Sequence, residues 1–285
     1  MSGGDAAAAD ARMLIALDID GTILPLDGVI QDATHREVDR LRAAGHEVML
    51  ATGRSWADTR GIHERLGLSS RYVVSANGAF TLERDADARP NERGGFDREA
   101  YAPAWIETFD PTEVLRRLRS GLGEAHYAIE TPDGEFRYAG GLFPEASFEA
   151  AGRECEFEEL LNQRATRVVV VSPDRSSEEF NRLVESSGLH QVSYSVGWTN
   201  WLDIAPHGVN KATALERVRR ELGIPRERVF ACGDGRNDIE MLAWAREFGR
   251  SVAMGQAPQE VFDASSAITG KIEDEGLAAA LREIR

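Results

Sequence analysis

The sequence predicts an α/β fold in which a doubly wound, mostly parallel sheet carries an inserted α+β domain. Two observations support this prediction. Apolar runs typical of buried strands alternate with helical patterns from residue 13 to about residue 75, and again after residue 206. Between these stretches lies a mixture of strand-like and helix-like segments, roughly 120 residues long, which is the size of a domain.

The first part of the predicted sheet begins with the apolar run Met13–Leu17, which is typical of a fully buried strand. Gly45 is well placed to end the helix that follows, and the next strand closes a right-handed βαβ unit. The expected elements after the first strand are a helix near 33–44, a strand at 46–51, a helix near 55–66 and a strand at 72–75.

The inserted domain is expected at residues 83–205, with 13–82 and 206–285 as the two parts of the core and 1–12 as a disordered leader. A polar stretch with Pro90 and adjacent glycines marks its beginning as a linker or an exposed hairpin. The elements expected within it are helices near 111–122 and 176–187, and strands near 127–129, 136–138, 168–171, 191–196 and 201–204.

The last part of the chain returns to alternating strands and helices. A helix is expected near 211–222, where Gly223 and Pro225 end it. The strands 229–232 and 251–254 follow, each with a helix after it.

Composition narrows the possible partners. The formal net charge of −15 argues against binding to a nucleic-acid backbone, and no apolar run approaches the roughly 20 residues needed to cross a bilayer. Cys155 and Cys232 have no metal-ligand spacing, and Cys232 lies in an apolar run, as a small core residue would. We expect a cytoplasmic protein that is a monomer or a weak homodimer.

Polar groups that could carry chemistry follow the predicted strands directly. The carboxyl ends of parallel strands meet at one edge of a sheet, so these groups should converge. Converging carboxylates repel one another and raise one another's pKa values, and a hard cation removes the problem. Oxygen ligands without clustered histidines or cysteines favour Mg²⁺ over zinc. The groups are Asp18 with Asp20, Thr52, Asn77, and Asp234 with Asp238.

The stretch Asp18-Ile19-Asp20-Gly21-Thr22 is the most informative of these segments. Two carboxylates two residues apart leave a strand on the same side, so one can attack while the other handles protons. Taken alone, the stretch is also typical of a calcium loop or an ordinary turn.

Four motifs in order resemble those of the haloacid dehalogenase superfamily of phosphohydrolases. They are Asp-Ile-Asp-Gly-Thr at 18–22, Thr52 after a strand, Lys211 at the start of a helix, and Gly-Asp-Gly-Arg-Asn-Asp at 233–238. The segments Ala-Thr-Gly-Arg at 51–54 and Ala-Asn-Gly-Ala at 76–79, with the inserted domain, resemble the Cof-like branch, subfamily IIB. The chain departs from that pattern at Ala212, where glycine is usual, and at Gln256, where asparagine is common.

The resemblance implies a Mg²⁺-dependent phosphatase that acts on a small phosphorylated metabolite, a sugar phosphate or a phosphorylated cofactor, through an aspartyl-phosphate. Asp18 would be the nucleophile and Asp20 the general acid and base. Asp18, Asp234 and Asp238 would bind the metal through carboxylates, Asp238 directly or through water, and Asp20 through its backbone carbonyl. The inserted domain would act as a cap that excludes water and determines substrate specificity.

The resemblance also implies phosphate- or substrate-binding roles. Thr52 and Lys211 would hold the phosphoryl oxygens, although Thr52 alone is equally typical of a helix N-cap and Lys211 alone of a surface charge. Arg54 could instead pair with a helix carboxylate, and Arg137 and Arg167 in the cap are more typical of solvated charges than of substrate contacts. The predicted binding residues are Thr52, Gly53, Arg54, Asn77, Lys211 and Asn237.

Two alternative functions remain open at this stage. A phosphotransferase or phosphomutase would pass the phosphoryl group to a sugar hydroxyl instead of water, and Asp20 suits either reaction. A non-catalytic phospho-receiver would also place acidic residues and a lysine near Mg²⁺. The receiver is disfavoured because it needs neither an acid for the leaving group nor a cap.

Overall fold

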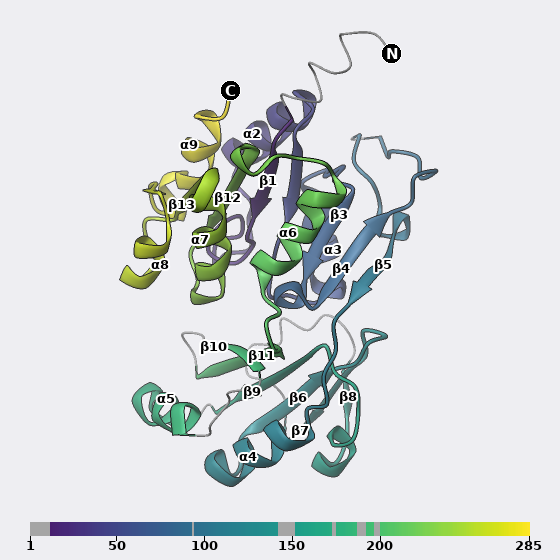
Figure 1. The fold of residues 1–285 in the computed structure, drawn as a ribbon, viewed down its shortest axis with the longest axis vertical. Helices are drawn as coiled ribbons and strands as arrows, with labels where there is room; N and C mark the ends of the chain where they lie inside the picture. The colour runs from purple at the N-terminus through teal and green to yellow at the C-terminus, as the bar shows by residue number, and fades with distance from the viewer. Residues whose placement is uncertain (1–11, 93, 142–151, 173–174, 187–191, 197–199) are drawn as a thin grey trace.

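The computed structural model describes residues 12–285 except 93, 142–151, 173–174, 187–191 and 197–199. Figure 1 shows a larger α/β body, which contains the C-terminus, and a smaller body that the chain enters after β5 and leaves after β11. Residues 1–11 of the expected leader lie outside the described residues, and Arg12 forms an ion pair with Glu47. No helix among the described residues is long and apolar enough to cross a membrane.

The larger body is built on a parallel five-stranded sheet with the strand order β14-β13-β12-β1-β2. All four residues of β1 are buried, because helices cover both faces of this central strand. The strands are β1 (Leu14–Leu17), β2 (Glu47–Leu50), β12 (Val229–Gly233), β13 (Arg250–Ala253) and β14 (Ala267–Ile268).

Helices pack on both faces of this sheet, as the doubly wound prediction requires. Apolar side chains of α2, α3 and α9 pack on one face, and those of α6, α7 and α8 pack on the other. Gly45, at φ +86°, follows the end of α2 as expected. The helices are α2 (Asp32–Ala43), α3 (Trp56–Arg65), α6 (Lys211–Glu221), α7 (Ile239–Phe248), α8 (Gln259–Ala264) and α9 (Gly276–Arg282).

A three-stranded antiparallel sheet continues the core beyond β2. Its first strand, β3 (Tyr72–Ser75), is joined to the end of β2 by a parallel bridge between Ala51 and Val74. β4 (Phe80–Arg84) and β5 (Tyr101–Ile106) then pair with β3 in turn. Residues expected at the start of the inserted domain are therefore hydrogen-bonded to the core sheet, and we propose that the inserted domain begins after Ile106 instead of at residue 83.

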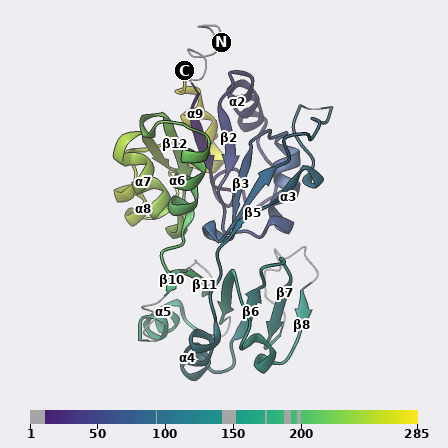
Figure 2. The same ribbon diagram turned by 45° about the vertical axis from the view of Figure 1, so that its right-hand side comes forward.

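The smaller body is a six-stranded sheet, antiparallel except for the pair β7–β8, with the strand order β10-β11-β9-β6-β7-β8. Its helices α4 (Thr112–Leu122) and α5 (Ser177–Ser186) lie on the side away from the core, as both views show (Figures 1 and 2). The strands are β6 (His126–Glu130), β7 (Phe136–Ala139), β8 (Arg153–Glu154), β9 (Arg167–Val171), β10 (Val192–Val196) and β11 (Trp201–Pro206).

Side chains alternate between the two faces of this smaller sheet. Ile129, Val170 and Leu202 pack with the leucines of α4, whereas their neighbours Ala128 and Val169 belong to a separate cluster. Short 3₁₀ turns complete the fold: η1 (Ala76–Gly78), η2 (Arg98–Ala100), η3 (Phe157–Leu160), η4 (Arg226–Arg228), η5 (Arg236–Asp238) and η6 (Ile272–Asp274). The prediction of an α/β fold with an inserted α+β domain is confirmed.

Candidate active site

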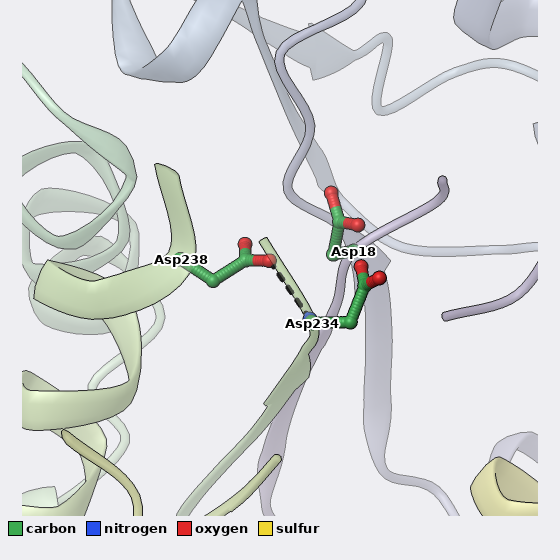
Figure 3. Close-up of side chains that lie close together, drawn as sticks. All are labelled: Asp18, Asp234 and Asp238. Carbon is green, nitrogen blue, oxygen red and sulfur yellow. Dashed lines mark hydrogen bonds between the residues drawn. The ribbon is translucent and has the colours of Figure 1, made fainter. Parts of the chain in front are cut away.

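Three carboxylates converge where β1 and β12 end side by side. Asp18 follows β1, Asp234 follows β12, and Asp238 lies in η5 (Figure 3). One oxygen of each carboxylate lies within 4.8 Å of the others. Parallel register between β1 and β12 explains the convergence, because it brings the carboxyl ends of both strands to the same edge of the sheet.

Lys211 supplies the positive charge at the centre of this cluster. Its Nζ donates hydrogen bonds to Asp18 Oδ1 at 2.6 Å and to Asp238 Oδ1 at 2.7 Å, and its side chain is 0% exposed. It begins α6, whose N-cap is Asn210. The chain has only two lysines, the other being Lys271. The sequence alternative of a solvated surface charge is therefore wrong for Lys211.

The other oxygen of Asp238 organises the loop that carries Asp234. Asp238 Oδ2 accepts hydrogen bonds from the backbone N–H groups of Asp234 at 3.1 Å and Gly235 at 3.0 Å, and Figure 3 shows the first of these. Both carboxylate oxygens of Asp238 are thus bound within the protein. Asp18 and Asp234 face each other across the remaining part of the cluster (Figure 3).

Burial and crowding leave the cluster with excess negative charge. Burial, and then the charge of Asp238, raise the pKa of Asp18 well above its usual value and the pKa of Asp234 to about 7. Burial alone would lower the pKa of Lys211, but the charges of Asp18 and Asp238 outweigh burial and raise it. A single lysine therefore faces three carboxylates, and a divalent cation would offset the remaining charge.

The turn after Asp18 is shaped to fit the carboxylate of Asp234. Gly21 has a φ of +74°, and a Cβ built on it would overlap the Asp234 carboxylate. Gln256 holds the same carboxylate from the other side: its Nε2 donates to Gly21 O at 2.6 Å and to Asp234 Oδ2 at 3.3 Å. Gln256, which stands where the resembling family commonly has asparagine, thus binds at the cluster.

Asp20 lies outside the three-carboxylate cluster. Its side chain is 60% exposed and pairs with Arg54, whose Nη2 lies 2.6 Å from Asp20 Oδ1 and whose Nε lies 2.9 Å from Asp20 Oδ2. This hydrogen bonding raises the pKa of Arg54. Arg54 therefore pairs with the predicted general acid, and the charge of Asp58 in α3 contributes further to its raised pKa.

The predicted phosphate-binding loop lies at the end of β2. Thr52 is fully buried, and its Oγ1 accepts a hydrogen bond from the backbone N–H of Arg54 at 3.1 Å. Ser55, not Thr52, is the N-cap of α3, since its side chain accepts from the backbone N–H of Asp58. The N-cap alternative for Thr52 is therefore wrong.

Asn77 connects this loop with two distant segments. It adopts a left-handed conformation with φ +50°, and its Nδ2 donates to Asp203 Oδ2 in the inserted domain at 2.9 Å. Its Oδ1 accepts from Asn237 Nδ2 at 3.0 Å. A Cβ on Gly53 would come within 3.3 Å of both asparagine side chains. The structure thus brings Gly53, Asn77 and Asn237 together.

Three charged residues of the inserted domain lie near this loop; sequence reasoning missed Glu130 and Asp203, and it considered Arg167 only as a substrate contact or a solvated charge. Glu130, Arg167 and Asp203 are buried, and Arg167 Nη1 donates to Gly53 O at 2.5 Å. Arg167 is thus not the solvated charge that was favoured, whereas Arg137 does pair with Glu135 near the surface. An acid within the apolar run Trp-Leu-Asp-Ile was a signal that could have revealed Asp203.

Comparison with known proteins shows which family this chain belongs to. Residues 15–281 match the model of haloacid dehalogenase-like hydrolases. The chain belongs to this family. It is 27% identical to a 5-amino-6-(5-phospho-D-ribitylamino)uracil phosphatase of Bacillus subtilis, covering 95% of this chain and 96% of that one. It is 28% identical to an HMP-PP phosphatase of Yersinia pseudotuberculosis, covering 93% of this chain and 92% of that one.

The solved structures agree with this membership. The structure of a sugar phosphatase of subclass IIB in this superfamily matches with a TM-score of 0.75 and 20% identity, covering 95% of this chain and 98% of that one. Predicted membership of the haloacid dehalogenase superfamily is confirmed, and the shared fold agrees with the Cof-like branch. The prediction that this hydrolase is an enzyme of the phosphatase type is confirmed as well.

Proposed function

We propose that this protein is a Mg²⁺-dependent phosphatase that acts on a small phosphorylated metabolite. The observation that carries the proposal is the environment of Asp18, a buried carboxylate held by Lys211 beside two further carboxylates. Lys211 favours the ionised form of this carboxylate, and an ionised carboxylate can act as a nucleophile. Family membership and the phosphatase names of full-length relatives support the same reaction.

In the first step, an oxygen of Asp18 attacks phosphorus, and the bond between phosphorus and the leaving oxygen breaks. Asp20 gives its proton to that oxygen. In the second step, Asp20 takes a proton from water, which attacks the same phosphorus and releases Asp18. In the structure Asp20 is exposed and paired with Arg54, so Asp20 must exchange this partner for substrate in order to act.

The three carboxylates fit Mg²⁺, which takes oxygen ligands and keeps several waters. Bound there, the metal would supply charge that offsets the transferring phosphoryl group. Asp18 and Asp234, together with the backbone carbonyl of Asp20, would hold it. Both oxygens of Asp238 already accept hydrogen bonds within the protein, which supports a role for Asp238 through water.

Thr52 and Lys211 are the proposed partners of the phosphoryl oxygens, with the backbone N–H of Gly53 beside them. Hydrogen-bond donors and an ammonium group aimed at developing charge are the main source of catalysis in phosphoryl transfer. The asparagines Asn77 and Asn237 bond to each other and to the inserted domain, so we assign them to the frame of the site.

The substrate class follows from the relatives and the cap. The relatives' names refer to a phosphorylated ribitylamino-uracil and to HMP-PP, both small molecules. The inserted domain lies over the strand ends that carry the site, where it would contact the leaving group (Figure 1). Both cysteines are free thiols, which supports the expected cytoplasmic location.

Release of phosphate from a chromogenic aryl phosphate tests the proposal. We expect turnover with Mg²⁺, its loss with EDTA, and a loss of at least about 10³-fold in kcat for Asp18→Asn. Asp39→Asn is the control, because Asp39 is an exposed residue of α2. Full activity in Asp18→Asn would refute the assignment of Asp18 as the nucleophile. Transfer of phosphate to an added sugar instead of water would indicate a phosphotransferase.

A further inference from the structure

Three buried charges lie on the core-facing side of the inserted domain. Glu130 ends β6, Arg167 begins β9 opposite it, and Asp203 lies in β11. Arg167 Nε donates to Glu130 Oε2 at 2.7 Å, and Arg167 Nη1 lies 3.5 Å from Asp203 Oδ2. The side chains of Glu130, Arg167 and Asp203 are 4%, 3% and 9% exposed, respectively. Pairs buried this deeply add little stability, because desolvation offsets their attraction, and their best-attested use is to specify one geometry.

Arg167 contacts the core at a backbone carbonyl in the phosphate-binding loop. Its Nη1 donates to Gly53 O at 2.5 Å. The peptide group between Gly53 and Arg54 is planar and trans, so the direction of the Gly53 carbonyl also sets the opposite direction of the Arg54 N–H. That N–H donates to Thr52 Oγ1 at 3.1 Å. A hydroxyl that accepts this bond still has its own proton to donate, so Arg167 influences where the Thr52 proton points.

Asp203 connects the same cluster, through Asn77, to the loop that contains Asp234 and Asp238. Its Oδ2 accepts from Asn77 Nδ2 at 2.9 Å, and Asn77 Oδ1 accepts from Asn237 Nδ2 at 3.0 Å. Asn237 lies in η5, next to Asp238. The buried cluster of the inserted domain therefore contacts the Gly53 loop directly and reaches the loop of Asp234 and Asp238 through Asn77.

We propose that Arg167 is a positioning residue that orients the Thr52 hydroxyl toward a phosphoryl oxygen when the inserted domain is seated on the core. Glu130 and Asp203 hold the guanidinium in the required direction. The proposal rests on the proposed function, because it assigns Thr52 to the phosphoryl oxygens. It implies that the core alone lacks a fully arranged phosphate site.

Arg167→Met removes the hydrogen bond to Gly53 while keeping much of the side-chain volume. Since Thr52 would donate mainly in the transition state, we expect kcat for an aryl phosphate to fall about tenfold or more, with KM changed less than threefold. Arg167→Lys should have a kcat between those of Arg167→Met and wild type, because lysine keeps the positive charge but lacks the guanidinium that bonds to Glu130 and Gly53 at once. Arg164→Met is the control, since Arg164 is exposed and its guanidinium bonds to Thr108 and not to Gly53.

Amide hydrogen exchange gives a readout that does not depend on activity. In Arg167→Met we expect the Arg54 amide to exchange at least tenfold faster, with the amides of β1 unchanged. An unchanged kcat or an unchanged Arg54 exchange rate would overturn the proposal. If the β1 amides also exchange faster, the same measurements on Arg167→Met with Glu130→Gln, which leaves no unpaired Glu130 charge, decide the question. A wild-type protein without phosphatase activity would refute the proposed function, while Arg54 exchange would still test the positioning.

Discussion

Lys211→Met removes the one ammonium group at the carboxylate cluster while nearly preserving the length and volume of the side chain. Lys211 is 0% exposed and lies 2.6 Å and 2.7 Å from oxygens of Asp18 and Asp238. At an effective dielectric constant of about 20, each pair has a gross attraction of about 6 kcal/mol. Desolvation cancels much of it, and breaking a buried pair from one side typically costs about 3–5 kcal/mol of stability.

The same substitution should damage catalysis as well as folding. Without the lysine, the pKa of Asp18 would lie still higher, because burial and Asp238 raise it and Lys211 opposes them, so a smaller fraction of Asp18 would be ionised and able to attack phosphorus. We expect kcat to fall about 10²- to 10³-fold, as for loss of one buried donor at a site of developing charge. Saturating Mg²⁺ should stabilise the variant more than the wild type, because the metal then provides the missing positive charge.

Denaturant unfolding with and without Mg²⁺, and steady-state hydrolysis of an aryl phosphate, measure these effects. Lys271→Met is the matched control, since Lys271 is the only other lysine in the chain and is exposed. It should leave the free energy of unfolding within about 0.5 kcal/mol of wild type and kcat within about twofold, as surface substitutions usually do. A Lys211→Met variant with wild-type kcat would refute the reasoning that Lys211 keeps Asp18 ionised.

Two further perturbations test the turn after Asp18 and the buried core. Gly21→Ala should lower the Mg²⁺ affinity measured by titration calorimetry at least about tenfold, because its Cβ would displace Asp234. Gly28→Ala is the control: Gly28 has a similar φ of +73°, and a Cβ there would meet no neighbour. This control should lose only about 1–2 kcal/mol of stability through backbone strain and keep its Mg²⁺ affinity. Burial lowers the pKa of His63 to about 3 in the folded protein, below the unfolded value of about 6.5, so its contribution to stability is complete above pH 6.5 and is lost as the pH falls. Urea unfolding at pH 7 and pH 5 should therefore show about 2 kcal/mol less acid destabilisation in His63→Phe than in wild type. The control His207→Phe, at an exposed site, should show the same acid destabilisation as wild type. An unchanged pH dependence in His63→Phe would contradict the prediction.

Local patterns in the sequence were enough to predict the core sheet and the place of the acidic groups. The run Leu14–Leu17 is apolar at every position because both faces of its strand are covered, and that continuous pattern is visible without a structure. Once parallel strands are inferred, Asp18 and Asp234 must lie at the same edge of the sheet. The start that we propose for the inserted domain, after Ile106, depends on the pairing of β4 and β5 with β3, which no local pattern specifies.

The sequence alone therefore determined the family, the fold class and the set of groups that could carry the chemistry, because these depend on short motifs and on the periodicity of apolar residues. Only the tertiary structure decided how those groups are paired. Whether Lys211 is a surface charge or a buried counter-ion, and whether Arg167 faces solvent or Gly53, depends on which distant segments pack against each other. Pairing of this kind comes from burial and long-range contacts, which the residues on either side do not encode.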